Sequence, residues 1–267
     1  MTLYNVLSHD FRNGLMRKKY FIATVIALVN FFDFIYSDYR LGLNGSFLDV
    51  ILHLFNGCAP IISGERGRLP LLWLLALSLS LILGMDYPLK DLTENGMQIL
   101  IRCNNRKLWF FSKCIWNIFH CLTYFIILVG TSFVLSVLFN VDISFTASEN
   151  WLPFLFPNES SIHFTVTQGI LVGILMPWLT IAAVNLLQMN LCLLFRPIVG
   201  FVICLSILVL SVFSTSPILL GNGAMTVRLV NTDVRTLIFL SDIFTAFGST
   251  LLGFVYFSRM DILAGDD

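Results

Sequence analysis

The sequence predicts an all-α polytopic membrane protein: a single transmembrane domain over residues 1–267 with six transmembrane helices, an N-terminal elbow helix and one re-entrant or interfacial helix. Hydrophobic residues make up 57% of the chain and charged residues 12%, whereas soluble domains contain roughly 45–50% apolar and 25% charged residues. The apolar residues gather in seven runs, most of them near the ~20 residues that a spanning helix needs. Clusters of Lys and Arg between the runs indicate the topology.

The first segment, 1–19, predicts an interfacial elbow helix that leads into the first span. Leu3, Leu7, Phe11 and Leu15 recur at four-residue spacing, so they share one face of a helix. Such an amphipathic helix lies along the membrane surface. The segment lacks the short charged start and apolar centre of a cleavable signal peptide, so we expect it to remain part of the protein.

The positions of the basic residues predict which side of the membrane each end of an apolar run faces. Basic residues precede the first run, and a second group follows the third run, at Arg102, Arg106, Lys107 and Lys113. The positive-inside rule places both groups in the cytoplasm, so an even number of crossings separates them. Three runs lie between the groups, and one of the three therefore does not span. The seven runs are 20–36, 47–62, 69–85, 114–140, 163–190, 197–214 and 237–257.

The run 47–62 is the one that we expect not to span, because it is short and contains Asp49 and His53. We predict a re-entrant or interfacial helix on the outer side, tolerated there if other helices cover it. Both termini then lie in the cytoplasm, and the connections 141–162 and 215–236 are extracellular. This topology leaves four arginines outside, against the rule: Arg66, Arg68, Arg228 and Arg235.

The segment 96–113 is the one long basic amphipathic stretch between predicted spans. On a helix, Arg102, Arg106 and Lys113 share one face, with apolar residues around them. This pattern is typical of a cytoplasmic loop helix that lies against the membrane or docks a partner. The plainer alternative is a loop that only satisfies the positive-inside rule.

Polar and small residues within the runs have two interpretations each. Asp33 lies near the outer end of the first run, either on a translocation path or as a hydrated carboxylate at the interface. Asn117 and His120 share a helix face, where hydrogen bonds between helices are the ordinary explanation and a translocation path is the other. Gly169 and Gly173 form a G-x-x-x-G pattern, for which we expect a contact within the chain rather than a dimer seam.

Several function classes lack their sequence features. The chain has no G-x-x-x-x-G-K-[ST] phosphate loop, so we expect it to bind no nucleotide and no other cofactor itself. Its six cysteines have no metal-ligand spacing, and it has no H-E-x-x-H helix, so we predict neither a metal site nor catalytic residues. A formal net charge of zero gives no indication of nucleic acid binding.

Three short stretches carry a resemblance to a known family. They are a proline–tryptophan run at 70–73, a G-x-Q-x-L-I-R segment at 96–102 and a W-x-x-S-K ending at 109–113, with Asp91 between the first two. Together with the predicted elbow helix, six spans and basic loop, they resemble the permease subunit of ABC-2 type transporters, which have the type V exporter fold. The three stretches resemble those of small Gram-positive permeases of this type.

The resemblance implies a coupling role and partners. In the family, the loop between spans two and three holds a coupling helix that fits a cleft on a separate ATPase subunit. Here that loop is 86–113, and the residues implied to contact the ATPase are Asp91, Gln98, Arg102 and Arg106. ATP and Mg would be bound by the ATPase, and a second permease copy or a homologous permease would complete the transporter.

The resemblance also implies export of a peptide or other amphipathic or hydrophobic cargo from a bacterial cell, with lipids of the cell membrane around the spans. The main alternative is a non-transporting polytopic membrane protein, an immunity or assembly factor, which would share the same hydropathy. The coupling segment distinguishes the two, because an immunity protein has no reason to bury Arg102 and Arg106 in an ATPase.

Overall fold

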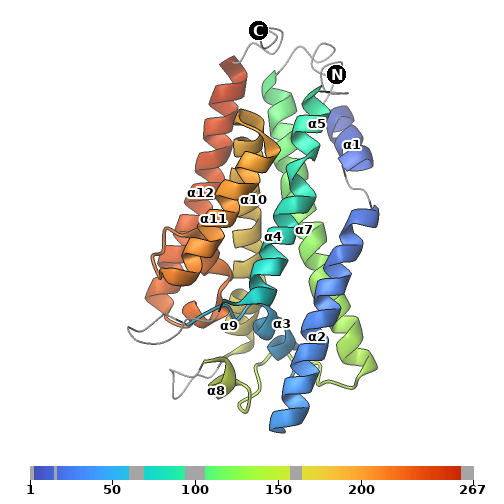
Figure 1. Cartoon of the computed structure of the whole chain (residues 1–267), viewed down its shortest axis with the longest axis vertical. Helices are drawn as coiled ribbons and strands as arrows, with labels where there is room; N and C mark the ends of the chain where they lie inside the picture. Colours follow the sequence, from blue (N-terminus) through green and yellow to red (C-terminus); the bar gives the residue numbers. More distant parts are fainter. Residues whose placement is uncertain (1–2, 15–16, 60–68, 94–105, 157–163, 260–267) are drawn as a thin grey trace.

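The computed structural model describes residues 3–14, 17–59, 69–93, 106–156 and 164–259, and in these residues the protein is all-α (Figure 1). The fold class predicted from the sequence is confirmed. The described residues form no strand, and their only β-type pairing is an isolated bridge between Ser46 and Asp142.

In the described residues, six long helices form a bundle, and shorter elements close its two ends (Figure 1). The long helices are α2 (Phe21–Leu41), α4 (Leu71–Met85), α7 (Arg106–Leu138), α10 (Met176–Leu194), α11 (Pro197–Phe213) and α12 (Thr232–Arg259). The shorter elements are α1 (Leu3–Gly14), η1 (Arg17–Tyr20), α3 (Phe47–Leu54), α5 (Tyr87–Thr93), α8 (Leu152–Leu155), α9 (Val166–Ile170), η2 (Leu171–Leu175), η3 (Leu220–Ala224) and η4 (Thr226–Arg228).

Five segments of the described chain are long and apolar enough to cross a membrane, which makes this a polytopic membrane protein. They are Phe21–Leu41, Leu71–Asp91, Lys107–Leu138, Val166–Leu194 and Thr232–Ser258. α11 is also apolar but has only 17 residues, about the lower limit for a spanning helix. It packs against α10 and α4 in the same bundle, so each of the six predicted spans corresponds to a helix.

The two ends of the bundle differ in what closes them (Figure 1). One end, which we name the α1 end, contains α1, α5, the start of α7 and the end of α12. The other, which we name the α3 end, contains α3, α8 and the described parts of the connections 141–162 and 215–236. The first and last helices of the chain therefore share one end of the bundle, and the two predicted outer connections share the opposite end.

α10 is the centre of the bundle. It packs against α4, α7, α11 and α12. In the most apolar stretch of its span 61% is buried, against 22% in that of α12. Polar side chains are buried along it, including Thr180, Asn185, Gln188 and Asn190. Because α10 is covered by other helices, such side chains can bond to protein groups instead of facing lipid.

α3 is the helix that the sequence predicted not to span. The Ser46 hydroxyl accepts a hydrogen bond from the Asp49 N–H, and the Asp49 carboxylate accepts one from the Ser46 N–H, which is a capping box. The helix then runs for eight residues, all buried except His53. Eight residues cover about 12 Å, far less than the ~30 Å hydrocarbon core of a bilayer.

α3 packs against the two glycines of the G-x-x-x-G pattern. A Cβ atom on Gly169 would lie 2.5 Å from Leu48 Cδ2, and one on Gly173 would lie 3.2 Å from Leu48 Cδ1. These glycines therefore allow a close helix contact within the chain. The π-type stretch η2 contains Gly173 and directly precedes the first turn of α10, where Pro177 lies. Proline has no N–H to bond to the preceding turn, which is an identifiable cause for a local change of helix type.

The connection after α7 is fastened to α2 and α3. Trp151 is fully buried, its Nε1 donates a 2.7 Å hydrogen bond to Asp38 Oδ1, and its ring stacks on Phe34 with centroids 4.5 Å apart. The Ser148 N–H donates a 3.0 Å hydrogen bond to the carboxylate of Asp49 in α3. Because its Ser148 and Trp151 contact α2 and α3 in this way, this connection is part of the core of the α3 end.

Arg228, one of the four arginines that opposed the predicted topology, is buried at this end. Its guanidinium donates hydrogen bonds to the carbonyl oxygens of Ser211 and Val212, in the last turn of α11, and to those of Ser214 and Cys58. Burial lowers the pKa of this guanidinium from its ordinary value, but arginine stays protonated in proteins. A cation at a helix C-terminus is favoured by the helix dipole, so Arg228 has a structural reason to lie here regardless of membrane side.

Candidate functional site

Three buried charges meet at the α1 end, between α1, α5 and α7. The buried side of α1 contains Val6 and Asp10, which are four residues apart and therefore share a helix face. Phe11 of the same helix packs edge-on against Phe119 of α7, with ring centroids 5.0 Å apart. Gly14 lies so close to the Trp116 ring that a side chain would collide with it. The elbow helix is thus a packed part of the bundle.

Lys113 is the positive charge of the cluster, and its side chain is completely buried. Its Nζ lies 2.6 Å from Asp91 Oδ2, on α5, and forms a second ion pair with Asp10 Oδ1, on α1. The ammonium also lies over the rings of Tyr87 and Trp109, 4.8 Å and 5.4 Å from their centroids, where cation–π attraction adds to the ion pairs. One lysine therefore joins α1, α5 and α7.

The two carboxylates have further donors. Tyr87 Oη donates a 2.9 Å hydrogen bond to Asp10, and Ser112 Oγ donates another to the same carboxylate. Trp109 Nε1 donates a 3.1 Å hydrogen bond to Asp91. Buried ion pairs offset their desolvation only with the help of additional hydrogen bonds, and the donors of Tyr87, Ser112 and Trp109 supply three of them here.

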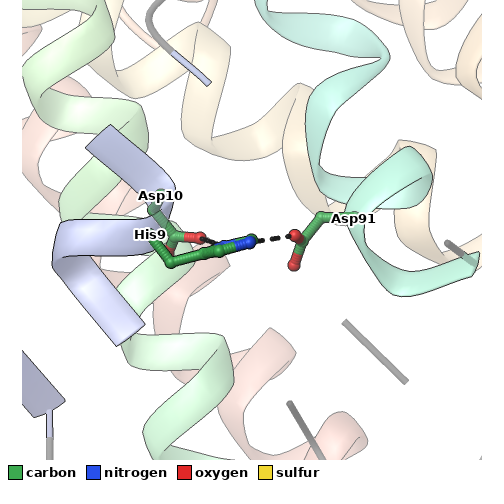
Figure 2. Close-up of side chains that lie close together, drawn as sticks. All are labelled: His9, Asp10 and Asp91. Carbon is green, nitrogen blue, oxygen red and sulfur yellow. Dashed lines mark ion pairs between the residues drawn. The ribbon is translucent and has the colours of Figure 1, made fainter. Parts of the chain in front are cut away.

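His9 completes the cluster (Figure 2). Its Nδ1 lies 3.9 Å from one oxygen of Asp10 and 3.9 Å from one oxygen of Asp91. Both distances are within ion-pair range but are longer than a hydrogen bond.

The same three side chains resemble a set of metal ligands. The donor atoms of His9, Asp10 and Asp91 lie within 4.8 Å of one another, and both imidazole and carboxylate bind metals. Lys113, however, places its ammonium at ion-pair distance from both carboxylates. A second cation would be repelled by it, so we interpret the cluster as an internal ion pair that fixes α1 to the bundle.

The cluster holds both ends of the predicted coupling segment. Asp91 lies near the end of α5, and Lys113 lies in the first turns of α7, so the two side chains flank the segment 94–105. The predicted loop 86–113 is thus helical at both of its ends, because α5 begins at Tyr87 and α7 already begins at Arg106.

The sequence-predicted coupling residues have different positions. Asp91 is buried and bonded to Lys113 and Trp109, so its carboxylate faces the protein interior. Arg106 is the first residue of α7, and its side chain is not described. Gln98 and Arg102 lie outside the described residues. Lys113, expected on the basic face with Arg102 and Arg106, is instead buried, because it is the counter-ion of Asp10 and Asp91.

Asn117 and His120 lie where α7 meets α2, α4 and α10. His120 Nδ1 is 2.6 Å from the hydroxyl of Tyr20, and its Nε2 is 3.3 Å from the carbonyl oxygen of Ser80 in α4. Asn117 Nδ2 donates a 3.4 Å hydrogen bond to the carbonyl oxygen of Asn185 in α10. Of the two interpretations, these contacts match the one in which the side chains bond neighbouring helices together.

Asp33 lies on the outside of α2. Its side chain is 53% exposed, and its Oδ2 is 3.7 Å from Nε2 of His53 on α3. His53 Nδ1 is in turn 3.1 Å from Oδ1 of Asn30, one turn earlier on α2. The exposed carboxylate does not line either of two apolar grooves in the described part of the bundle, whose lining residues are on α7, η2, α10 and α12 among others.

Sequence reasoning missed the pairing of Asp10 with Lys113, although a signal was present. A lysine directly before a long apolar run needs a counter-ion if its helix is extended into the bundle. Asp10, in an otherwise basic first segment, and Asp91, at the end of the second span, are acidic residues at the same predicted side of the membrane. Searching for acidic partners on that side would have suggested the cluster.

Comparison with protein-family models, with curated proteins and with solved structures found no match to this chain.

Proposed function

We propose that this chain is the membrane-spanning permease subunit of an ATP-driven ABC-2 type exporter, coupled through the segment 91–106 to a separate ATPase subunit. The proposal is supported by the resemblance of the stretches at 70–73, 96–102 and 109–113, and by an architecture of elbow helix and six bundle helices. In it, the α1 end is cytoplasmic and the α3 end faces out. The membrane is the cell membrane of a bacterium.

The observation that carries the proposal is the Asp10–Lys113–Asp91 cluster at the ends of the coupling segment. When an ATPase displaces the coupling segment, the transporter changes conformation only if this displacement is transmitted to the transmembrane helices. Here both flanks of the segment are tied to each other and to the elbow helix by buried ion pairs, which resist separation more strongly than exposed ones. A displacement of the segment would therefore move α1, α5 and the start of α7 together.

In this proposal, the contacts to the ATPase come from Gln98, Arg102 and Arg106, while Asp91 has a positioning role inside the cluster. ATP and Mg are bound by the ATPase. A second permease copy or a homologous permease completes the complex, and exposed apolar faces such as that of α12 meet lipids or this partner. The cargo is a peptide or another amphipathic or hydrophobic molecule.

Purification in a mild detergent from the native host, with co-purifying proteins identified by mass spectrometry, tests the proposal. We expect a stoichiometric ATPase subunit. Recovery of the chain alone, or only with other membrane proteins, would instead support an immunity or assembly factor.

Charge reversal then tests the coupling segment. The double variant Arg102→Glu/Arg106→Glu should insert normally but release the ATPase or uncouple its hydrolysis from transport. Arg196→Glu is a matched control, because Arg196 is an exposed arginine in the turn between α10 and α11. If the double variant retains the ATPase and couples its hydrolysis to transport as well as the control does, the coupling role is wrong.

A further inference from the structure

Asp242 is a fully buried carboxylate within a membrane-spanning helix. It lies about 15 Å along α12 from Thr232 and about 25 Å from the other end of this helix, at 1.5 Å per residue. Both distances place it well inside the bundle. An ionisable side chain at such a depth is costly and is a functional-site hypothesis by default.

The immediate contacts of Asp242 are few. Thr180 Oγ1, on α10, donates a 2.6 Å hydrogen bond to Asp242 Oδ2. The other oxygen, Oδ1, is buried and has no hydrogen-bond partner in the described chain. An ionised carboxylate normally accepts bonds at both oxygens when it is buried, so this one lacks half of the expected stabilisation.

A counter-ion is also missing among the described residues. Neither α10 nor η3 contains Asp, Glu, Lys or Arg, and no described cation forms an ion pair with Asp242. The charged ends of α12, at Asp233 and Arg235 and at Arg259, are turns away. Arg228, another cation of the α3 end, bonds to carbonyl oxygens and to Asn222. The titratable groups of the other elements packed against α12 are Cys192 on α10 and Arg106, Lys107, Lys113, Cys114, His120, Cys121 and Tyr124 on α7.

The surroundings also leave little room for a metal ion. Gly223 of η3 lies directly against the Thr180–Asp242 pair, since a side chain on this glycine would collide with Thr180 Oγ1 and Asp242 Oδ2. The oxygens against this glycine are those of Thr180 and Asp242, whereas hard cations such as Ca²⁺ and Mg²⁺ take six or more oxygen ligands. Ile238, one turn before Asp242, covers the same glycine with an apolar side chain.

From this geometry we propose that Asp242 is an intramembrane proton-binding site, whose carboxyl group holds a proton in the conformation described here. The neutral acid removes the uncompensated charge, and Thr180 continues to donate to Oδ2. Loss of the proton would place a charge against Gly223 and Ile238 in an apolar setting. Because η3 packs on both α10 and α12 at this point, deprotonation would push η3 out of the bundle and loosen the α3 end.

Infrared difference spectroscopy of the purified, full-length protein tests the proposal. At neutral pH, the spectrum of the wild type minus that of Asp242→Asn should contain the C=O stretch of a protonated carboxylic acid. Asp233→Asn is the matched control, because Asp233 is an exposed carboxylate in the first turn of the same helix. Its difference spectrum should contain carboxylate bands only. Carboxylate bands in the Asp242→Asn difference would overturn the proposal, and their dependence on added Na⁺ would then indicate a bound cation.

Two further measurements separate protonation from a merely structural role. Thr180→Val should shift the acid C=O band to higher frequency, because that oxygen loses its donor. At neutral pH, Asp242→Asn should have the same unfolding temperature as the wild type. At alkaline pH the variant should be more stable, because residue 242 loses a proton in the wild type but not in the variant. Equal unfolding temperatures for both proteins across the whole pH range would contradict the linkage to packing.

Discussion

The two ends of the bundle are held together by different kinds of interaction. At the α1 end, Lys113 pairs with Asp10 and Asp91, so buried charges of opposite sign lie in contact. At the α3 end, Asp49 and Arg228 are bonded mainly to backbone N–H and C=O groups. At the α1 end, the loss of one charged side chain therefore also destabilises its partners. At the α3 end, each contact can be lost with less effect on the others.

This difference has an energetic reason. Removing one member of a buried ion pair leaves its partner charged and unpaired, at a cost of about 3–5 kcal/mol. Removing a side chain that bonds to backbone leaves neutral groups behind, and each of these costs less. We therefore expect the largest mutational effects at the α1 end.

Lys113→Met gives the largest expected effect. Both carboxylates lose their counter-ion, so we predict a loss of about 3–5 kcal/mol in the free energy of unfolding, seen as a lower unfolding temperature in detergent and faster proteolysis of α1. Lys107→Met is the control, because Lys107 is exposed on the same helix. The triple variant Asp10→Asn/Asp91→Asn/Lys113→Met should recover much of the loss. Equal unfolding temperatures for Lys113→Met and Lys107→Met would contradict the expectation that mutations have their largest effects at the α1 end.

Arg228→Met gives an intermediate expected effect. Five acceptors lose a charged donor, the carbonyl oxygens of Cys58, Ser211, Val212 and Ser214 and the side chain of Asn222. A hydrogen bond to a charged group contributes about 1.5–3 kcal/mol, and the acceptors left behind are neutral oxygens rather than unpaired charges.

The readout for Arg228→Met is local. In a variant that retains Cys58 as its only cysteine, we expect maleimide labelling of Cys58 to become faster when Arg228 is replaced, because its carbonyl oxygen is no longer held. Arg235→Met, at the start of α12, is the matched control. An unchanged labelling rate would mean that other contacts alone keep the α3 end closed.

Ser46→Ala gives the smallest expected effect. The capping box of α3 loses its hydroxyl, which costs about 1 kcal/mol, while the Asp49 carboxylate keeps its bonds from the Ser46 and Ser148 N–H groups. Thermal unfolding should show a small downward shift. Ser78→Ala is the control, because Ser78 bonds only within its own exposed turn of α4. A loss as large as that of Lys113→Met would show that the α3 end is not a set of independent contacts.

Periodicity and hydropathy were sufficient to predict the long helices and α3, but not the short helices α5 and α8. Each apolar run became a helix, and the run with Asp49 and His53 became the short buried α3. Boundaries were less predictable: α7 begins at Arg106, eight residues before the predicted run, because its charged first turns pack against α1 and α5. The charges of Lys113 and Arg228 were assigned to surfaces because the positive-inside rule counts basic residues without asking what they bond to.

The buried polar contacts could not be predicted, because their partners are far apart in the sequence. Nothing local connects Asp10 with Lys113, 103 positions later, or Thr180 with Asp242, 62 positions later. Their pairing depends on how the helices are packed, which a hydropathy pattern does not specify. Of the predicted coupling residues, only Asp91 has a described side chain, and its burial is likewise a consequence of packing.

The separation between Asp10 and Lys113 also has a consequence during synthesis. At roughly 5–20 residues per second, Lys113 leaves the ribosome on the order of 5 to 20 s after Asp10 does. During that interval Asp10 lacks the ammonium that it pairs with in the folded protein, so burying it would leave an unpaired charge. Docking of this helix is therefore a late event in biogenesis, and a chain interrupted before Lys113 would keep its first helix exposed to proteases and chaperones.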